Sequence, residues 1–208
     1  MAKKSKSAAP KKKEHHLSDL IGHYIDNVKA SRISLEDLME LLGNRSIGGL
    51  LLILSLPLTV PLAAPALSGV FGIPLILIAI QLVMGRNTVW LPKFLKKRSF
   101  SRDKFVRTFK RIMPLLRGLE KLLKPRLAWL SSKWMAIPIG VVCILLAVTI
   151  ALPVPFGNII PSFALIFFAL GLVQHDGLAI AFGYLVSLIA SLLVWGAVAG
   201  AISAIDIF

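Results

Sequence analysis

The sequence is organised around one stretch, Leu152-Pro153-Val154-Pro155-Phe156-Gly157-Asn158-Ile159-Ile160-Pro161. This stretch interrupts an uncharged run at 134–174, and a run of roughly 40 residues is long enough for two membrane crossings. Proline lacks a backbone donor and clashes with the preceding turn, so it ends a helix, yet it is tolerated in the first turn. We therefore expect a helix over 136–152, a break, and a second helix over 159–173.

An earlier uncharged run, at 46–85, has the same plan: it reads Leu56-Pro57-Leu58-Thr59-Val60-Pro61, then Pro65, then Phe71-Gly72-Ile73-Pro74. The segment before the first of these prolines is too short to span, since a crossing takes about 20 residues. A return helix is expected over 73–84. Because broken backbone cannot face lipid, we predict that the two broken hairpins, re-entrant or kinked, pack together as an imperfect repeat. Their breaks are then expected to meet near the middle of the membrane.

The composition is that of an integral membrane protein. Of 208 residues, 56% are hydrophobic and only 16% are charged, whereas soluble domains carry about 25% charged residues. No Asp, Glu, Lys or Arg lies in 46–85, 134–174 or 177–205. The last of these runs is long enough for one tilted span. We expect an all-α membrane protein with two broken hairpins, a long C-terminal transmembrane helix and cytoplasmic surface helices.

The basic residues predict the orientation. The net charge is +14, and every Lys and Arg lies in 1–45 or 86–133. Cytoplasmic loops of membrane proteins collect Lys and Arg, which accounts for the charge without nucleic acid. The N-terminus and 86–133 are therefore expected on the cytoplasmic side of a multi-pass protein, with an even number of crossings or a re-entrant hairpin between them.

The chain divides into segments that follow this pattern. They are a disordered basic tail at 1–16, cytoplasmic amphipathic helices at 17–45, the first broken hairpin at 46–85, a basic cytoplasmic loop at 86–133, the second broken hairpin at 134–176 and the C-terminal helix at 177–208. The single cysteine, Cys143, lies in an apolar run, without the further ligands that a metal site needs. No metal or cofactor is expected.

Helix-capping residues mark the first cytoplasmic segment. Ser18 is expected to cap a helix over 17–30, whose apolar residues form one stripe. Ser34, with Asp37 at the third helical position, is expected to cap a helix over 34–42.

The basic loop is expected to form two amphipathic helices separated at Pro114. Ser101 is expected to cap the first, in which Phe105, Phe109 and Ile112 align on one face. A basic helix with an aromatic and leucine-rich face is typical of a membrane surface.

The breaks and their flanks resemble the ExoD family, which is named for exopolysaccharide synthesis. The resemblance extends from about Leu17 onward. The matching stretches are 17–43, Leu54-Ser55-Leu56-Pro57, Ser68-Gly69-Val70-Phe71-Gly72-Ile73-Pro74, 81–85, Trp90-Leu91-Pro92, the basic loop, 153–161, Leu170-Gly171-Leu172 and Asp176-Gly177. The first break carries more alanine than the family pattern. The resemblance implies a bacterial inner-membrane protein of polysaccharide production or export, and it carries over no catalytic residue.

Polar residues and helix-breaking residues at the breaks are the candidate ligand site, namely Asn158, Gln81, Ser68, Pro57, Pro153 and Gly157. A helix that starts near Pro161 would offer free N–H groups and a positive dipole end to an anionic group, such as the phosphate of a lipid carrier. The alternatives are that Asn158 caps this helix and that Gln81 bonds a neighbouring helix. His175-Asp176 is interpreted either as a proton relay or as a turn that ends a helix.

Small residues in the last helix predict an interface. Gly196 and Gly200 lie one turn apart and allow another helix to approach closely. We interpret this face either as the contact of a homodimer or higher oligomer, or as packing within the subunit.

Three functions remain open. The first is a protein, not an enzyme, that handles or transports a lipid-linked or anionic precursor. The second is a scaffold that binds polysaccharide-synthesis proteins through the basic loop. The third is an enzyme acting on a lipid-linked sugar, for which the apolar runs offer no carboxylate. In each case the lipid bilayer is a partner and nucleic acid is not.

Overall fold

The computed structural model describes residues 17–28, 30–42, 47–59, 64–86, 88–151 and 158–205, without the side chains of 17, 64–70, 100, 104, 128, 133, 195 and 197–205. Most of this part of the chain is helical, as expected. The predicted tail at 1–16 and the proline-rich centre of the second break lie outside the described residues.

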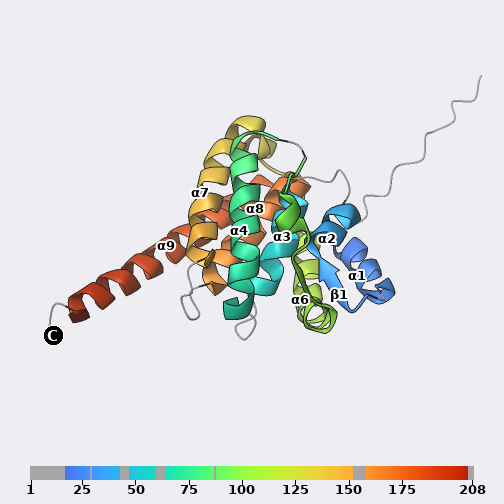
Figure 1. The fold of residues 1–208 in the computed structure, drawn as a ribbon. Helices are drawn as coiled ribbons and strands as arrows, with labels where there is room; N and C mark the ends of the chain where they lie inside the picture. Colours follow the sequence, from blue (N-terminus) through green and yellow to red (C-terminus); the bar gives the residue numbers. More distant parts are fainter. Residues whose placement is uncertain are drawn as a thin grey trace, which may run out of the picture.

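Two helical hairpins form the centre of the molecule (Figure 1). The first consists of α3 (Ile47–Ser55), the short 3-10 helix η1 (Leu56–Thr59) and α4 (Ala64–Val83). The second consists of α7 (Lys133–Ala151) and α8 (Ile159–Gln174). In the bundle α4 packs against α7, and α3 packs against α8, so each hairpin contacts the other through both of its helices.

The helix α3 is the most enclosed element, because all of its residues are buried. Its low polarity and nine-residue length suit a position surrounded by protein rather than a complete crossing. The long helix α9 (Gly177–Ile205) packs on α8 and extends past the bundle, where it ends at the lower left of Figure 1.

Glycines set the close contacts between paired helices. A Cβ added at Gly48, near the start of α3, would lie 3.2 Å from the carbonyl oxygen of Ala169, near the end of α8. A Cβ added at Gly140, near the start of α7, would lie 3.2 Å from the carbonyl oxygen of Ala79, near the end of α4. Both pairs of helices are therefore antiparallel.

The two hairpins enter and leave the bundle at the same end. The start of α9 lies against the residues that precede α7, since a Cβ added at Gly177 would meet the carbonyl oxygen of Leu127 at 2.5 Å. The end of α8 and the start of α7 are thus neighbours. At the opposite end, a Cβ added at Gly72 would lie 2.9 Å from that of Ala151, the last residue of α7.

The outer faces of the bundle are apolar. Two described helical segments, Trp134–Ala151 and Gly177–Val194, are long and apolar enough to cross a membrane. They expose large side chains that include Val141, Leu145, Val148, Leu185, Leu188 and Leu192. Exposed aromatic residues lie near the helix ends, as is usual at a membrane interface: Trp90, Phe94, Trp129 and Trp134.

A smaller unit packs beside α3 and contains the polar segments. It comprises α1 (Leu17–Asn27), β1 (Arg32–Ser34), α2 (Leu35–Leu42), α5 (Lys93–Lys96), β2 (Ser99–Ser101) and α6 (Arg102–Leu122). The strands pair antiparallel, with Ile33 opposite Phe100. The capping prediction for α2 is confirmed, because Asp37 N–H donates to Ser34 Oγ at 3.1 Å and Ser34 N–H donates to the Asp37 carboxylate at 2.7 Å.

A buried carboxylate fixes the first helix to this unit. Glu120, only 3% exposed, accepts hydrogen bonds from the backbone N–H of Ser18, at 3.1 Å, and from its hydroxyl. Ser18 was expected to cap α1 with its own side chain, and this is wrong because its hydroxyl is bound to α6. The carboxylate of Glu120 takes over the capping role at the positive end of α1.

The basic loop departs from the prediction in four ways. The helix α6 continues through Pro114 as one element, and a two-stranded sheet joins the loop to the N-terminal segment. Ser101 occupies the N-cap position of α6 without a side-chain cap hydrogen bond. The apolar face, which includes Phe105, Phe109 and Ile112, is buried, and α6 packs on α1, on the sheet and on η1. That face is therefore used inside the protein rather than at a membrane surface.

The first break is also shorter than predicted. We expected the return helix to begin at Ile73, but α4 begins at Ala64 and continues through Pro74. Pro65, in the first turn of α4, holds the position in which proline is tolerated. In the second hairpin α8 begins at Ile159, as predicted, with Pro161 in its first turn.

Candidate functional site

The flanks of the two breaks come together at one end of the bundle. The 3-10 turn η1, which precedes the first break, packs against α8, which begins directly after the second. On the other side Gly72 of α4 lies against Ala151, the residue before the second break. These contacts bring the described flanks of the two breaks together in one bundle, while the meeting of the breaks themselves near the middle of the membrane stays a prediction.

Hydroxyl groups near the breaks donate to carbonyls of their own helices. Ser55, fully buried, donates to the carbonyl of Leu52 at 3.0 Å, and Thr59 donates to that of Leu56 at 2.8 Å. In the second hairpin Ser162 donates to the carbonyl of Asn158 at 2.5 Å. Because a buried hydroxyl that is already bonded costs little to enclose, these residues can sit beside interrupted backbone without water.

Asn158 stands at the first turn of α8 and is 2% exposed. It occupies the N-cap position with helical backbone angles, and its side chain makes no cap hydrogen bond. The N-cap interpretation thus holds for its position but not for its side chain. Pro57 is buried in η1, which packs against α8. Pro153 and Gly157 lie outside the described residues, and so does the side chain of Ser68.

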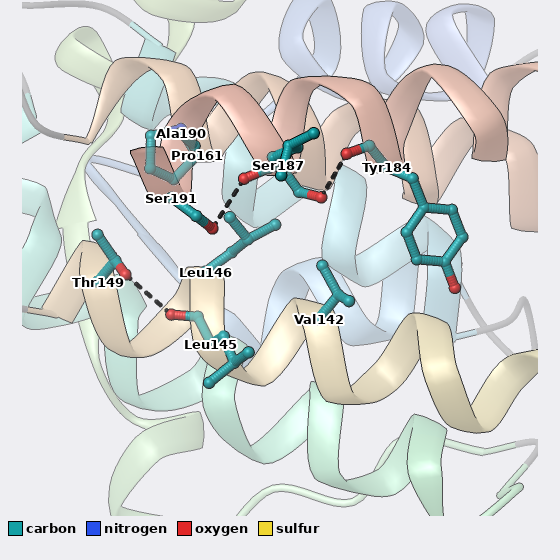
Figure 2. Close-up of a pocket in the computed structure, with 10 residues that line it drawn as sticks. Val142, Leu145, Leu146, Thr149, Pro161, Tyr184, Ser187, Ala190 and Ser191 are labelled. Atoms are coloured by element: carbon teal, nitrogen blue, oxygen red, sulfur yellow. Dashed lines mark hydrogen bonds between the residues drawn. The ribbon is translucent and has the colours of Figure 1, made fainter. Parts of the chain in front are cut away.

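A groove opens beside the start of α8 (Figure 2). Its volume is about 270 Å³. Its walls come from α7 and α9, and Pro161 of α8 lies at its edge. The hydroxyl groups on the walls donate to carbonyls of their own helices: Thr149 to Leu145 at 3.0 Å, Ser187 to Tyr184 at 2.8 Å and Ser191 to Ser187 at 2.9 Å.

Sequence reasoning missed this groove. Its residues come from two helices whose pairing the sequence does not reveal. The available signal was the four-residue spacing of Ser187 and Ser191, which places two small polar side chains on one face of an otherwise apolar helix. Polar residues inside apolar helices commonly mark interfaces or ligand paths.

Gln81 lies away from the breaks, near the other end of the bundle. Its Nε2 donates to the carbonyls of Trp90, at 2.8 Å, and Leu77, at 3.0 Å, and its Oε1 accepts from the N–H of Trp90 at 2.6 Å. These bonds hold the turn after α4 in place. The structure therefore does not bring Gln81 together with Asn158.

The His175-Asp176 pair also lies at that end, and its two side chains have different partners. His175 Nδ1 lies 3.0 Å from Ser131 Oγ. The carboxylate of Asp176, 2% exposed, accepts from the N–H of Leu178 and of Lys124, both at 2.9 Å. Asp176 thus caps α9 and ties it to the basic loop, which is the turn interpretation.

The remaining candidates concern metal and oligomer contacts. Among the described residues, no group of three or more His, Cys, Asp or Glu side chains is placed to hold a metal ion. Gly196 is exposed, and a Cβ added there would meet no described atom within 4 Å. Gly200 lies in α9, in the part where side-chain surroundings are not described.

Comparison with known proteins places the chain in a family. Residues 17–196 match the model of the family described as "Exopolysaccharide synthesis, ExoD". The chain is 31% identical over 176 residues to Protein ExoD of Rhizobium meliloti, covering 82% of this chain and 72% of that protein. It is 28% identical over 176 residues to an uncharacterized protein of Synechocystis, covering 84% and 83%. No solved structure matches it. The chain belongs to the ExoD family of exopolysaccharide synthesis proteins.

Proposed function

We propose that the protein is a multi-pass protein of the bacterial inner membrane that holds or moves a lipid-linked or anionic polysaccharide precursor at the helix breaks, without catalysing a reaction. The family membership gives the process, exopolysaccharide synthesis. One observation carries the rest: the flanks of both breaks converge beside the start of α8, where a groove opens between α7 and α9. Broken helices that meet in a membrane are a common way to form a substrate site.

The roles of the buried carboxylates support a function other than catalysis. Glu120 is bound to the backbone and hydroxyl of Ser18, and Asp176 is bound to the backbone of Lys124 and Leu178. Both groups hold separate segments of the chain together. A general acid or base must instead reach the proton it transfers, within hydrogen-bonding distance of a substrate.

A scaffold function is favoured by a different feature, the outward face of α6. This face exposes Arg107, Lys110, Arg111, Arg117 and Lys121, while the acidic Glu120 of the same helix is turned inward. A cationic face of this kind can bind an acidic protein surface or anionic lipid. In this alternative the protein positions polysaccharide-synthesis proteins rather than their precursor.

The proposed topology places α6 and the N-terminus in the cytoplasm, since the basic residues gather there. Both hairpins return to the side from which they enter, and α9 then crosses so that the C-terminus lies outside. The test is labelling of a Lys110→Cys variant, with Cys143 replaced by Ala, by a reagent that does not cross membranes. We expect labelling only in opened cells, and efficient labelling of intact cells would overturn the topology.

The function is tested in a strain that depends on the protein for polysaccharide. We expect Asn158→Ala to accumulate in the membrane and to lower polysaccharide output, because Asn158 lies beside the converging breaks. A matched control is Asn27→Ala, since Asn27 is an exposed asparagine at the end of α1. Full output from Asn158→Ala, Ser162→Ala and Ser68→Ala would show that the breaks serve only structure.

A biochemical assay separates the two candidate functions. The purified protein in liposomes is expected to bind or translocate a lipid-linked sugar. If it does neither, and instead co-purifies with synthases through contacts that charge reversal at Lys110 and Arg111 abolishes, the scaffold function replaces the proposed one.

A further inference from the structure

The groove between α7 and α9 has its mouth in the apolar outer surface. Leu145 of α7 and Leu188 of α9 line it, and these side chains are 63% and 59% exposed. Both helices include segments that are long and apolar enough to cross a membrane. On the proposed topology, in which both helices belong to the membrane-spanning bundle, the mouth faces the hydrocarbon of the bilayer rather than water.

The walls of the groove suit an apolar occupant. Thr149, Ser187 and Ser191 direct their hydroxyl protons to carbonyls of their own helices. The hydroxyl of Tyr184, the remaining polar group among the lining side chains, is buried without a hydrogen-bond partner among the described residues. The other lining side chains are mostly aliphatic, such as Val142 and Leu146. An ion entering here would lose its hydration without a charged partner, whereas a hydrocarbon chain would lose nothing.

The size of the groove suits one chain. Its volume is about 270 Å³. Figure 2 shows the lining residues spread along the space between the two helices, from Tyr184 at one end to Ser191 at the other. A slot of this form suits a single hydrocarbon chain lying along its length. A diacyl phospholipid would leave its second chain outside.

We propose that this groove binds the hydrocarbon chain of a single-chain lipid carrier, a polyprenyl phosphate or its sugar-linked form. This inference rests on the proposed function and names its substrate class. The chain enters from the bilayer between Leu145 and Leu188. Because Pro161 belongs to both the groove and the first turn of α8, the groove leads to the converging breaks where the precursor is handled.

Photolabelling of the full-length protein in liposomes tests the proposal. One sample contains a polyprenyl phosphate with a diazirine on its chain, and a second contains the same amount of phosphatidylglycerol with a diazirine on one acyl chain. Leu188→Trp with Ser191→Trp fills the groove from exposed positions. Leu185→Trp with Leu192→Trp is the matched control, since both leucines are more than half exposed on α9 and do not line the groove. If the filled double variant does not accumulate, Ser191→Trp alone replaces it.

We expect the polyprenyl probe to label peptides of α7 and α9. Filling the groove should lower this labelling at least about tenfold, the factor that corresponds to the lost burial of only two methylene groups. The control should label like the unmodified protein. Equal labelling by the phospholipid probe, or unchanged labelling of the filled variant, would overturn the proposal. A third outcome would also overturn the proposal. If two copies of a Leu188→Cys variant form a disulfide with each other and labelling by the probe falls as the disulfide forms, a second copy of the chain occupies the groove.

Polysaccharide output distinguishes this proposal from the function on which it rests. If filling abolishes labelling, while the filled variant and the Asn158→Ala, Ser162→Ala and Ser68→Ala variants all give full output, the groove binds the chain and the proposed function fails. If Asn158→Ala lowers output while the groove shows no labelling in any variant, the function stands and the groove proposal fails.

Discussion

Gly48 and Gly140 occupy equivalent positions in the two hairpins. A Cβ added at either residue would lie 3.2 Å from a carbonyl oxygen of the facing helix, that of Ala169 or Ala79. The facing helix also places a valine next to each glycine: Val173 lies beside Gly48, and Val83 lies beside Gly140. Ala169 and Val173 lie four residues apart in the sequence, and so do Ala79 and Val83. This repetition supports a parallel repeat with an approximate two-fold relation between the hairpins.

The ends of the return helices repeat as well. Gly85, with φ +64°, follows α4, and His175, with φ +53°, follows α8. After each, a backbone N–H bonds back to a carbonyl inside the helix: Arg86 to Gln81 at 3.1 Å, and Asp176 to Gly171 at 3.0 Å. Both helices therefore end in a left-handed turn of the Schellman type.

Substitution at Gly140 is expected to loosen the contact between α4 and α7. A Cβ there would lie 2.9 Å from the backbone nitrogen of Val83, which cannot move like a side chain. Gly140→Ala should lower the free energy of unfolding by roughly 1–3 kcal/mol, the usual cost of overpacking. Thermal unfolding in detergent measures this. Gly118→Ala in α6, where a Cβ meets nothing within 4 Å, is the control and should be neutral or stabilising.

Removing the carboxylate of Asp176 is expected to separate α9 from the basic loop. Asp176→Ala leaves the N–H groups of Lys124 and Leu178 without their acceptor, and the loss of these two part-buried hydrogen bonds costs about 1–3 kcal/mol in total. Hydrogen exchange at 124–132 and at the start of α9 should rise together. By contrast, His175→Gly should be neutral or stabilising because glycine adopts positive φ without strain. Unchanged exchange in Asp176→Ala would contradict the capping role.

The sequence predicts the apolar helices because each depends on a local signal, an apolar run. Proline marks the start of α8, with Pro161 in its first turn, but Pro74 does not mark the start of α4, which continues through it. The capping pair Ser34 and Asp37 is equally local. The predictions that were wrong concern features set by contacts between segments far apart in the sequence. Pro114 lies within one continuous helix because α6 packs along α1, the sheet and η1. Strands β1 and β2 are three residues each and far apart in sequence, so no alternation reveals their pairing.

In the candidate site, too, features with a local sequence signal were predicted and features that depend on tertiary contacts were not. Asn158 beside the second break follows from a local motif. Gln81 does not join it, because its amide reaches the backbone of Trp90 beyond the end of α4. The groove between α7 and α9 depends on how two helices diverge, and no local pattern encodes that divergence.

Gln81→Leu is expected to release the turn after α4 while the bundle remains folded. The leucine side chain fills a volume similar to that of glutamine but cannot make either of the two hydrogen bonds to the backbone of Trp90. Limited proteolysis after Arg86 should become faster, and the fluorescence of Trp90 should change. Gln81→Glu keeps the acceptor for the Trp90 N–H but loses the donor, so an intermediate rate is expected. Equal rates in all three proteins would contradict this role.

High pH is expected to loosen the N-terminal unit. Burial, with further effects of Asp37 and Glu40, raises the pKa of Tyr24 above its ordinary value of 10.0. The folded state therefore favours the neutral phenol. Its contribution to stability is complete below pH 10 and falls as the pH rises through the higher folded pKa. Hydrogen exchange of α1 should accelerate in this range, and Tyr24→Phe should remove the phenol's part of the effect.

The exposed end of α9 allows a clean test of the homo-oligomer. Gly196 contacts no described atom of its own subunit within 4 Å of an added Cβ, so a larger side chain there has room in the single chain. If another copy packs on this face, Gly196→Ile with Gly200→Ile should block the close approach of the two backbones and lower the particle mass in nanodiscs. Because helix association in lipid depends on such close packing, even one methyl group at the contact is expected to weaken it, and Gly196→Ala should give an intermediate mass distribution. Leu185→Ala on the same helix is the control, since it shortens an exposed side chain without adding bulk. An unchanged mass for the double isoleucine variant would reject the contact between subunits and leave this face to lipid.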